Sequence, residues 1–107
     1  MLKMHRFTIG LFDKDAKIQL IDTATAMNKI NAVFCTPAGF GFPGITMMNC
    51  YGAFTHEDGT YIFEPSIRVE VAAEDVPALA IASVLKAPEV LNQESIMYEF
   101  DGEVTFL

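Results

Sequence analysis

Apolar residues recur at two different periods along this chain, and the order of those periods limits the possible folds more than any other feature. Residues 4–11 alternate between apolar and polar, which is typical of a β-strand with one buried face. Residues 26–34 have apolar positions three and four apart, which predicts an amphipathic helix. Asp22 stands where its carboxylate can cap the start of that helix.

The rest of the chain predicts two more strands, a second helix and two short strands after it. Residues 45–54 predict a second strand, residues 61–71 predict a third that alternates from Ile67 to Val71, and the turn at residues 56–59 predicts a hairpin between them. Pro65 lacks a ladder donor, so we expect the pairing to be interrupted or bulged there. The acidic residues before Pro77 predict a second helix that runs to about Ala87. Two short strands then follow around Asp101-Gly102, a pair typical of a type I′ turn.

This order predicts an α+β domain of the ferredoxin-like class, with the arrangement β-α-β-β-α-β over residues 1–107. Right-handed crossovers place both helices on one face of an antiparallel sheet, which an extra short C-terminal strand extends. The other face of the sheet then has no cover from its own chain, and several residues expected there are apolar or aromatic. We therefore expect a homo-oligomer, a trimer or a dimer.

The charge of the chain excludes one large class of partner. Among 107 residues, 14 are acidic and 7 are basic, which gives a net charge of −7. Direct binding to nucleic acid needs clustered Lys and Arg, so we do not expect it. No apolar run approaches the roughly 20 residues of a membrane span, and no signal peptide precedes the first strand, which predicts a cytoplasmic protein without membrane contact.

The residues that bind metals are few and far apart. Cys35 and Cys50 lack the CxxC spacing of a metal or redox motif, which predicts free thiols. His5 and His56 lie on different predicted elements. We therefore expect neither a metal site nor a cofactor.

Eight residues are candidates for contact with a ligand or partner: Phe40, Phe42, His56, Glu57, Asp58, Glu64, Ser66 and Arg68. The two phenylalanines lie on a loop rich in Gly and Pro, where they would contact a neighbouring subunit, line a cleft or pack over their own sheet edge. The carboxylates gather around one predicted hairpin, where they would bind a cation or partner or simply be solvated. The serine and the arginine follow on the next strand.

Five short motifs of this chain are Gly44-Ile45-Thr46, Tyr51-Gly52, Gly59, Glu64-Pro65-Ser66 and Val69-Glu70-Val71. Their order along the chain resembles the layout of the PII-like and CutA-like superfamily. This resemblance implies a trimer with a nucleotide between subunits. The chain departs from that layout, because its connection between the two central strands is short and basic residues that would hold phosphates are absent around it. Separately, Gln93-Glu94-Ser95 resembles a bacterial family of unknown function.

Three functions follow from these observations. The first is a non-enzymatic oligomeric module that binds a protein or small ligand at subunit interfaces. The second is an acidic inhibitor from a mobile element that mimics nucleic acid and presents Glu57, Asp58, Glu64 and Glu70 to a basic groove. The third is a small enzyme that uses Glu64, Ser66, Arg68 or His56 in an interface cleft.

Overall fold

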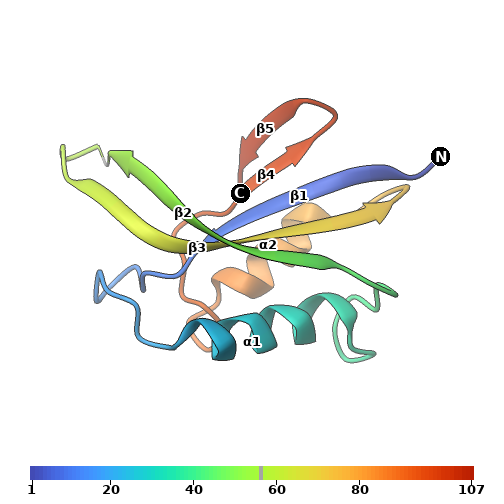
Figure 1. Cartoon of the computed structure of the whole chain (residues 1–107), viewed down its shortest axis with the longest axis horizontal. Coiled ribbons are helices and arrows are strands. Elements are labelled where there is room, and N and C mark those ends of the chain that lie inside the picture. Colours follow the sequence, from blue (N-terminus) through green and yellow to red (C-terminus); the bar gives the residue numbers. More distant parts are fainter. Residues whose placement is uncertain (56) are drawn as a thin grey trace.

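The structure, a computed structural model, describes residues 1–55 and 57–107. Its elements are β1 (Lys3–Gly10), α1 (Thr23–Cys35), β2 (Thr46–Thr55), β3 (Tyr61–Ala73), α2 (Ala78–Lys86), β4 (Met97–Phe100) and β5 (Glu103–Phe106) (Figure 1). The predicted order β-α-β-β-α-β is confirmed, and β5 is the expected extra strand. None of the helices among the described residues has the length and apolarity to span a membrane.

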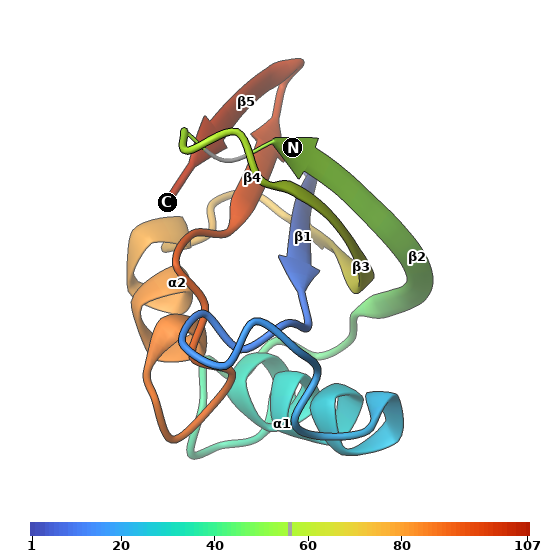
Figure 2. The same cartoon turned by 90° about the vertical axis from the view of Figure 1, so that its left-hand side faces the viewer.

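The strands form one antiparallel sheet with the order β2-β3-β1-β4-β5. Figure 2 shows the sheet curving around α1 and α2, which both lie on its inner side. The α+β fold of the ferredoxin-like class is therefore confirmed.

The core lies between the helices and this inner face. In β1 and β3 the alternate residues that point to the helices are fully buried, because successive side chains of a strand point to opposite faces. Phe7 of β1 contacts Phe34 of α1 edge to face, with ring centroids 5.3 Å apart. The largest side chains of this core are Phe7, Phe34, Ile9, Ile30, Ile67, Ile81, Leu85 and Ile96.

Two details of the strands differ from or refine the sequence interpretation. The expected break at Pro65 is wrong, because β2 and β3 pair without interruption and Pro65 lies opposite Tyr51. The carbonyl of Pro65 accepts from the backbone N–H of Leu11, just after β1 ends. The N–H that proline lacks would lie on that same side, where the pairing of β3 with β1 has already ended. At the last turn, Asp101 (φ 53°) and Gly102 (φ 81°) have the positive angles of the predicted type I′ turn.

The second helix starts later than its acidic residues suggest. Pro77 stands at the N-cap position with ψ of 70°, outside the first turn, and the helix begins at Ala78. Glu74 and Asp75 therefore lie in the connection that follows β3 rather than at the first free amides of α2.

The outer face of the sheet is mixed rather than apolar. Arg6 of β1 pairs with Glu70 of β3, with Nε 2.5 Å from Oε2, and its Nη1 lies 3.8 Å from Oε1 of Glu99 in β4. By strand alternation, exposed apolar side chains surround this network on the same face, and they are Met4, Met48, Val104 and Phe106.

Candidate functional site

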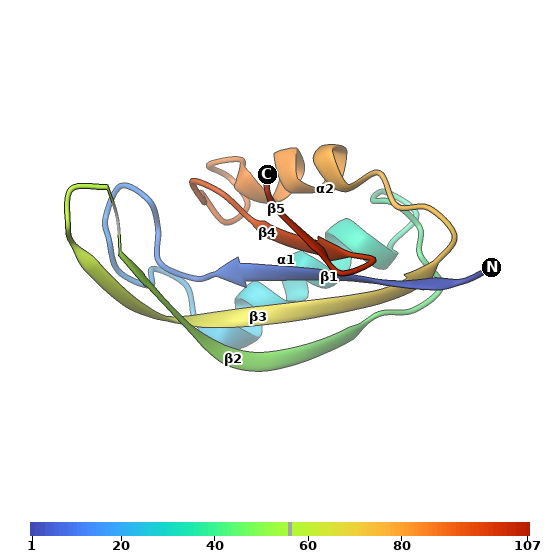
Figure 3. The same ribbon diagram turned by 90° about the horizontal axis from the view of Figure 1, so that it is seen from above.

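β2 and β3 continue well beyond the rest of the sheet. The pairing of β1 with β3 stops at Gly10 and Ser66, whereas β2 and β3 stay paired out to Thr55 and Tyr61. Figure 3 shows this two-stranded extension, residues 51–55 and 61–65, projecting at one end of the molecule. We refer to it as the hairpin arm.

The hairpin arm exposes four aromatic rings. Their exposed fractions are 69% for Tyr51, 45% for Phe54, 65% for Tyr61 and 57% for Phe63. Tyr51, Tyr61 and Phe63 occupy positions that share the helix side of the sheet. Tyr51 and Phe63 stack in parallel, with an interplanar angle of 2° and ring centroids 5.3 Å apart. Exposed aromatic surface of this kind marks a binding surface.

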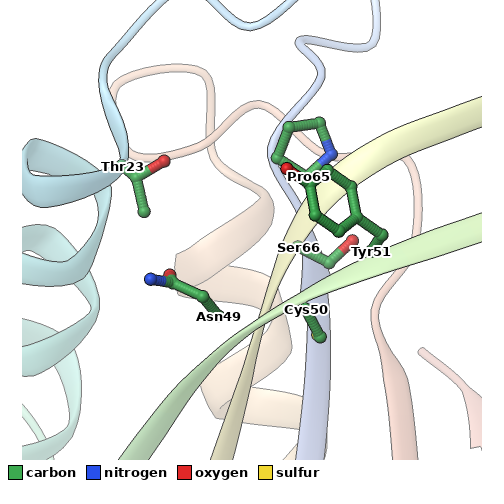
Figure 4. A pocket seen from close by; sticks show the side chains of 6 residues that line it. All are labelled: Thr23, Asn49, Cys50, Tyr51, Pro65 and Ser66. Carbon is green, nitrogen blue, oxygen red and sulfur yellow. The ribbon is translucent and has the colours of Figure 1, made fainter.

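A cleft of about 180 Å³ lies where the hairpin arm leaves the sheet, beside the start of α1, and its lining consists of Thr23, Asn49, Cys50, Tyr51, Pro65 and Ser66. In Figure 4, Thr23 faces the strands from the first turn of α1, and the amide of Asn49 points from β2 toward the helix. Asn49 and Tyr51 are alternate residues of β2, so both side chains lie on the helix side.

The polar groups of the cleft are neutral. Thr23 supplies a hydroxyl and Asn49 an amide, whereas the side chains of Cys50 and Ser66 point to the other face of the sheet by strand alternation. No charged side chain is part of the lining that the structure describes. The nearby N-terminus of α1 is already capped by Asp22, whose Oδ1 accepts from the backbone N–H of Thr25 at 2.7 Å. This hydrogen bond lowers the pKa of Asp22. The cleft therefore suits a neutral polar group such as a heterocycle or a ribose.

Glu64 anchors the base of the hairpin arm from the other side. It is 6% exposed and its Oε2 accepts from the backbone N–H of Phe12 at 2.9 Å. A Cβ on Gly10 would lie 2.6 Å from Glu64 Cδ, so the glycine leaves the space that this carboxylate occupies. Glu64 thus ties the loop before α1, and with it one wall of the cleft, to β3.

The predicted candidates lie in several different places. Glu57 and Asp58 are exposed near the tip of the hairpin, where Asp58 Oδ1 accepts from the backbone N–H of Thr60. His56 lies outside the residues that the structure describes. Ser66 lines the cleft, and Arg68 lies half-buried on the outer face of the sheet. Within the described ranges, no three His, Cys, Asp or Glu side chains gather closely enough to hold a metal.

The two phenylalanines of the Gly/Pro loop pack on their own chain. Phe40 and Phe42 are half-buried against the core, and Phe42 lies 6.2 Å from the ring of Phe34. The backbone N–H of Phe42 donates to the carbonyl of Phe34 at 2.9 Å, which fixes the loop against the end of α1.

Sequence reasoning missed Thr23, Asn49 and Tyr51 as cleft residues. Only Tyr51 carried a signal, since a large aromatic residue beside a glycine near the end of a strand has no evident core partner. Thr23 and Asn49 become neighbours through the crossover from α1 to β2, which a pattern along the chain does not reveal.

No family model matches this sequence, and no curated protein does. Among solved structures the fold is similar to that of a phage SAM lyase. The structure of that lyase in complex with S-methyl-5′-thioadenosine matches 99% of this chain and 88% of its own, with a TM-score of 0.66 and 17% identity. Its apo state matches 97% of this chain and 86% of its own, with a TM-score of 0.62 and the same 17% identity.

These matches correct the main functional expectation. The expected non-enzymatic binding module is wrong, because the fold shared over nearly the whole chain is that of an enzyme. The third sequence-based alternative, a small enzyme with a cleft, fits these findings better. The dispersal of the acids also weakens the nucleic-acid mimic, since Glu64 is buried and Glu70 is paired with Arg6.

Proposed function

We propose that this chain is a small lyase that acts on S-adenosylmethionine and releases S-methyl-5′-thioadenosine. The observation that carries the proposal is the whole-chain likeness in fold to a phage SAM lyase, one structure of which holds S-methyl-5′-thioadenosine. Fold alone does not determine chemistry, so the proposal also depends on the cleft and the aromatic residues beside it. We expect the reaction to occur in the cytoplasm.

The cleft has the chemistry that an adenosine moiety requires. The Asn49 amide offers both donors and an acceptor to the edge of a heterocycle, and the hydroxyl of Thr23 can pair with a ribose oxygen. The Tyr51 ring supplies an apolar wall at the edge of the cleft. Ligand sites commonly combine such apolar walls with a few convergent polar groups.

The lining also bears on the route of the reaction. Release of S-methyl-5′-thioadenosine breaks the bond between sulfur and the aminobutyryl carbon, and the electron pair stays on the sulfur, which becomes a neutral thioether. The carbon gains a bond if the substrate's own carboxylate oxygen attacks it and closes a lactone, a route that transfers no proton. The described lining holds no carboxylate or imidazole that would act as a general base. We therefore favour this internal displacement over an elimination.

We further propose that the enzyme is a homo-oligomer in which a second copy closes the open side of the cleft. Tyr51 and Phe63 are 69% and 57% exposed, which is more than a small-ligand site leaves uncovered. The exposed apolar residues of the outer sheet face offer a surface for the same association. Light scattering at micromolar concentration tests this assembly, and a strict monomer would refute it.

The activity is tested by incubating the purified chain with S-adenosylmethionine and separating the nucleosides by chromatography. We expect S-methyl-5′-thioadenosine to form, whereas S-adenosylhomocysteine would indicate methyl transfer instead. Asn49→Ala should lower the rate about tenfold or more, the effect of losing about 1.4 kcal/mol of binding in the transition state. Asn28→Ala, on the exposed side of α1, is the matched control and should keep the rate. No S-methyl-5′-thioadenosine from folded protein in excess over substrate would overturn the proposal.

A further inference from the structure

The substrate of the proposed lyase carries a fixed positive charge on its sulfur, and the cleft offers that charge no counter-ion. The residues of its described lining are Thr23, Asn49, Cys50, Tyr51, Pro65 and Ser66, and none of them is charged. A neutral cleft can hold the nucleoside, but it cannot distinguish a sulfonium from a thioether of nearly the same shape. The charge must therefore be recognised just outside it.

The stacked pair of Tyr51 and Phe63 stands at that place. Tyr51 belongs to the cleft wall and to the pair at once, so the ring faces begin where the neutral lining ends. The two planes differ by 2° and the ring centroids lie 5.3 Å apart, so each ring partly covers the inner face of the other and keeps one electron-rich outer face. Such faces attract cations held within about 6 Å of the ring centroid. Both rings are more than half exposed, which leaves these faces open to a ligand.

The charge of the residues around the stacked pair also favours a cationic ligand. Residues 51–65 contain three acidic residues, Glu57, Asp58 and Glu64, and neither Lys nor Arg. The whole chain has a net charge of −7. This field attracts a cationic ligand and repels phosphorylated nucleotides.

We propose that Tyr51 is a specificity-determining residue that holds the sulfonium against its open ring face, while Phe63 positions this ring from behind, and that the pair so selects the charged substrate over neutral thioether analogues. This inference rests on the proposed function. It has a consequence for turnover: once the bond to sulfur breaks, the thioether product has no charge for the rings to attract and it dissociates more readily than the substrate.

The test compares two unreactive ligands by calorimetry. Sinefungin carries an ammonium group at the position of the sulfonium, whereas S-adenosylhomocysteine has a neutral sulfur there. We expect the native protein to prefer sinefungin. Tyr51→Leu should weaken sinefungin binding about 2- to 30-fold, the range of a cation–π contact, and Phe63→Leu should weaken it less. Both variants should change S-adenosylhomocysteine binding much less.

Two controls isolate the ring faces. Tyr61→Leu removes another exposed ring of the hairpin arm, one outside the pair of Tyr51 and Phe63, and should leave both affinities unchanged. Tyr51→Phe keeps the ring face and should keep the preference for the cation. Circular dichroism of every variant confirms that it is folded.

Three results would overturn the inference. If the leucine variants lose both ligands equally, the rings stack on the adenine, and the proposed function survives without charge selection. If the native protein binds both ligands equally, the rings do not recognise the positive charge. If it binds neither and forms no S-methyl-5′-thioadenosine, the proposed function itself fails.

Discussion

The buried pair of His5 and Tyr98 makes a sharp test of how this fold is stabilised. The His5 side chain is 2% exposed, with Nδ1 2.6 Å from the Tyr98 hydroxyl and Nε2 3.2 Å from the carbonyl oxygen of Ala73. A carbonyl only accepts, so Nε2 carries the hydrogen and Nδ1 accepts from the tyrosine hydroxyl. Tyr98→Phe keeps the ring, which packs 4.9 Å from Phe7, and removes only the donor.

The expected cost follows from the unpaired nitrogen. A buried acceptor left without its donor costs about 1–3 kcal/mol in the free energy of unfolding. For a domain of this size, that loss lowers Tm by about 4–12 °C. Urea denaturation followed by circular dichroism measures it, and Tyr61→Phe, at a position 65% exposed, is the matched control. A difference below about 0.5 kcal/mol between Tyr98→Phe and the native protein would refute this reasoning.

The free energy of unfolding at alkaline pH provides a second test of the role of Tyr98. Burial, with a smaller contribution from the Asp75 carboxylate, raises the pKa of Tyr98. A tyrosine whose pKa is raised on folding stabilises the fold fully below the unfolded value of about 10, and this stabilisation is lost as the pH rises through the folded value. The stability gap between the native protein and Tyr98→Phe should therefore be constant near neutral pH and shrink above about pH 10. A gap that stays constant up to the highest pH at which the protein folds would contradict the assignment.

The remaining predictions concern the base of the cleft, the start of α1 and the core. Gly10→Ala places a Cβ 2.6 Å from Glu64 Cδ and should cost about 1–3 kcal/mol in urea, whereas Gly44→Ala, with nothing within 4 Å, should cost almost nothing. Asp22→Ala removes the helix cap and should lower Tm at neutral pH, but Asp22→Asn should not. The backbone N–H of Thr25 lowers the pKa of Asp22, so the effect of Asp22→Ala should be fully present above about pH 4 and shrink as the pH falls through the lowered value. Phe34→Ala should cost about 3–5 kcal/mol by the same urea assay, because this ring is fully buried.

The fold was predictable because its signals are local. The alternation of residues 4–11 and the helical spacing of residues 26–34 each depend on neighbours a few positions away. The Asp101-Gly102 turn likewise needs only its own two residues to accept positive φ. The break at Pro65 was wrong because its effect depends on where β1 ends, which is a fact about another segment.

The candidate site was less predictable because its residues come from segments that lie far apart in the sequence. Glu64 was grouped with the hairpin carboxylates, but the chain after β1 covers it and donates to it from Phe12. Thr23 and Asn49 belong to one cleft only after α1 has packed beside β2. Neither residue has a neighbour in the sequence that marks it as functional.

The two sides of the proposed site differ in how firmly they are held, and this difference bears on selectivity. At the base of the hairpin arm, Glu64 and Pro65 are each bonded to the chain after β1, so the neutral cleft is preorganised. Further out, Phe63 belongs to a region where β2 pairs with β3 but β1 no longer does. A two-stranded hairpin alone is only marginally stable, so the stacked rings gain order from whatever they contact. In the proposed lyase, the rigid cleft would bind the adenosine part that substrate and product share, and the adaptable rings would discriminate between them by the charge that only the substrate carries.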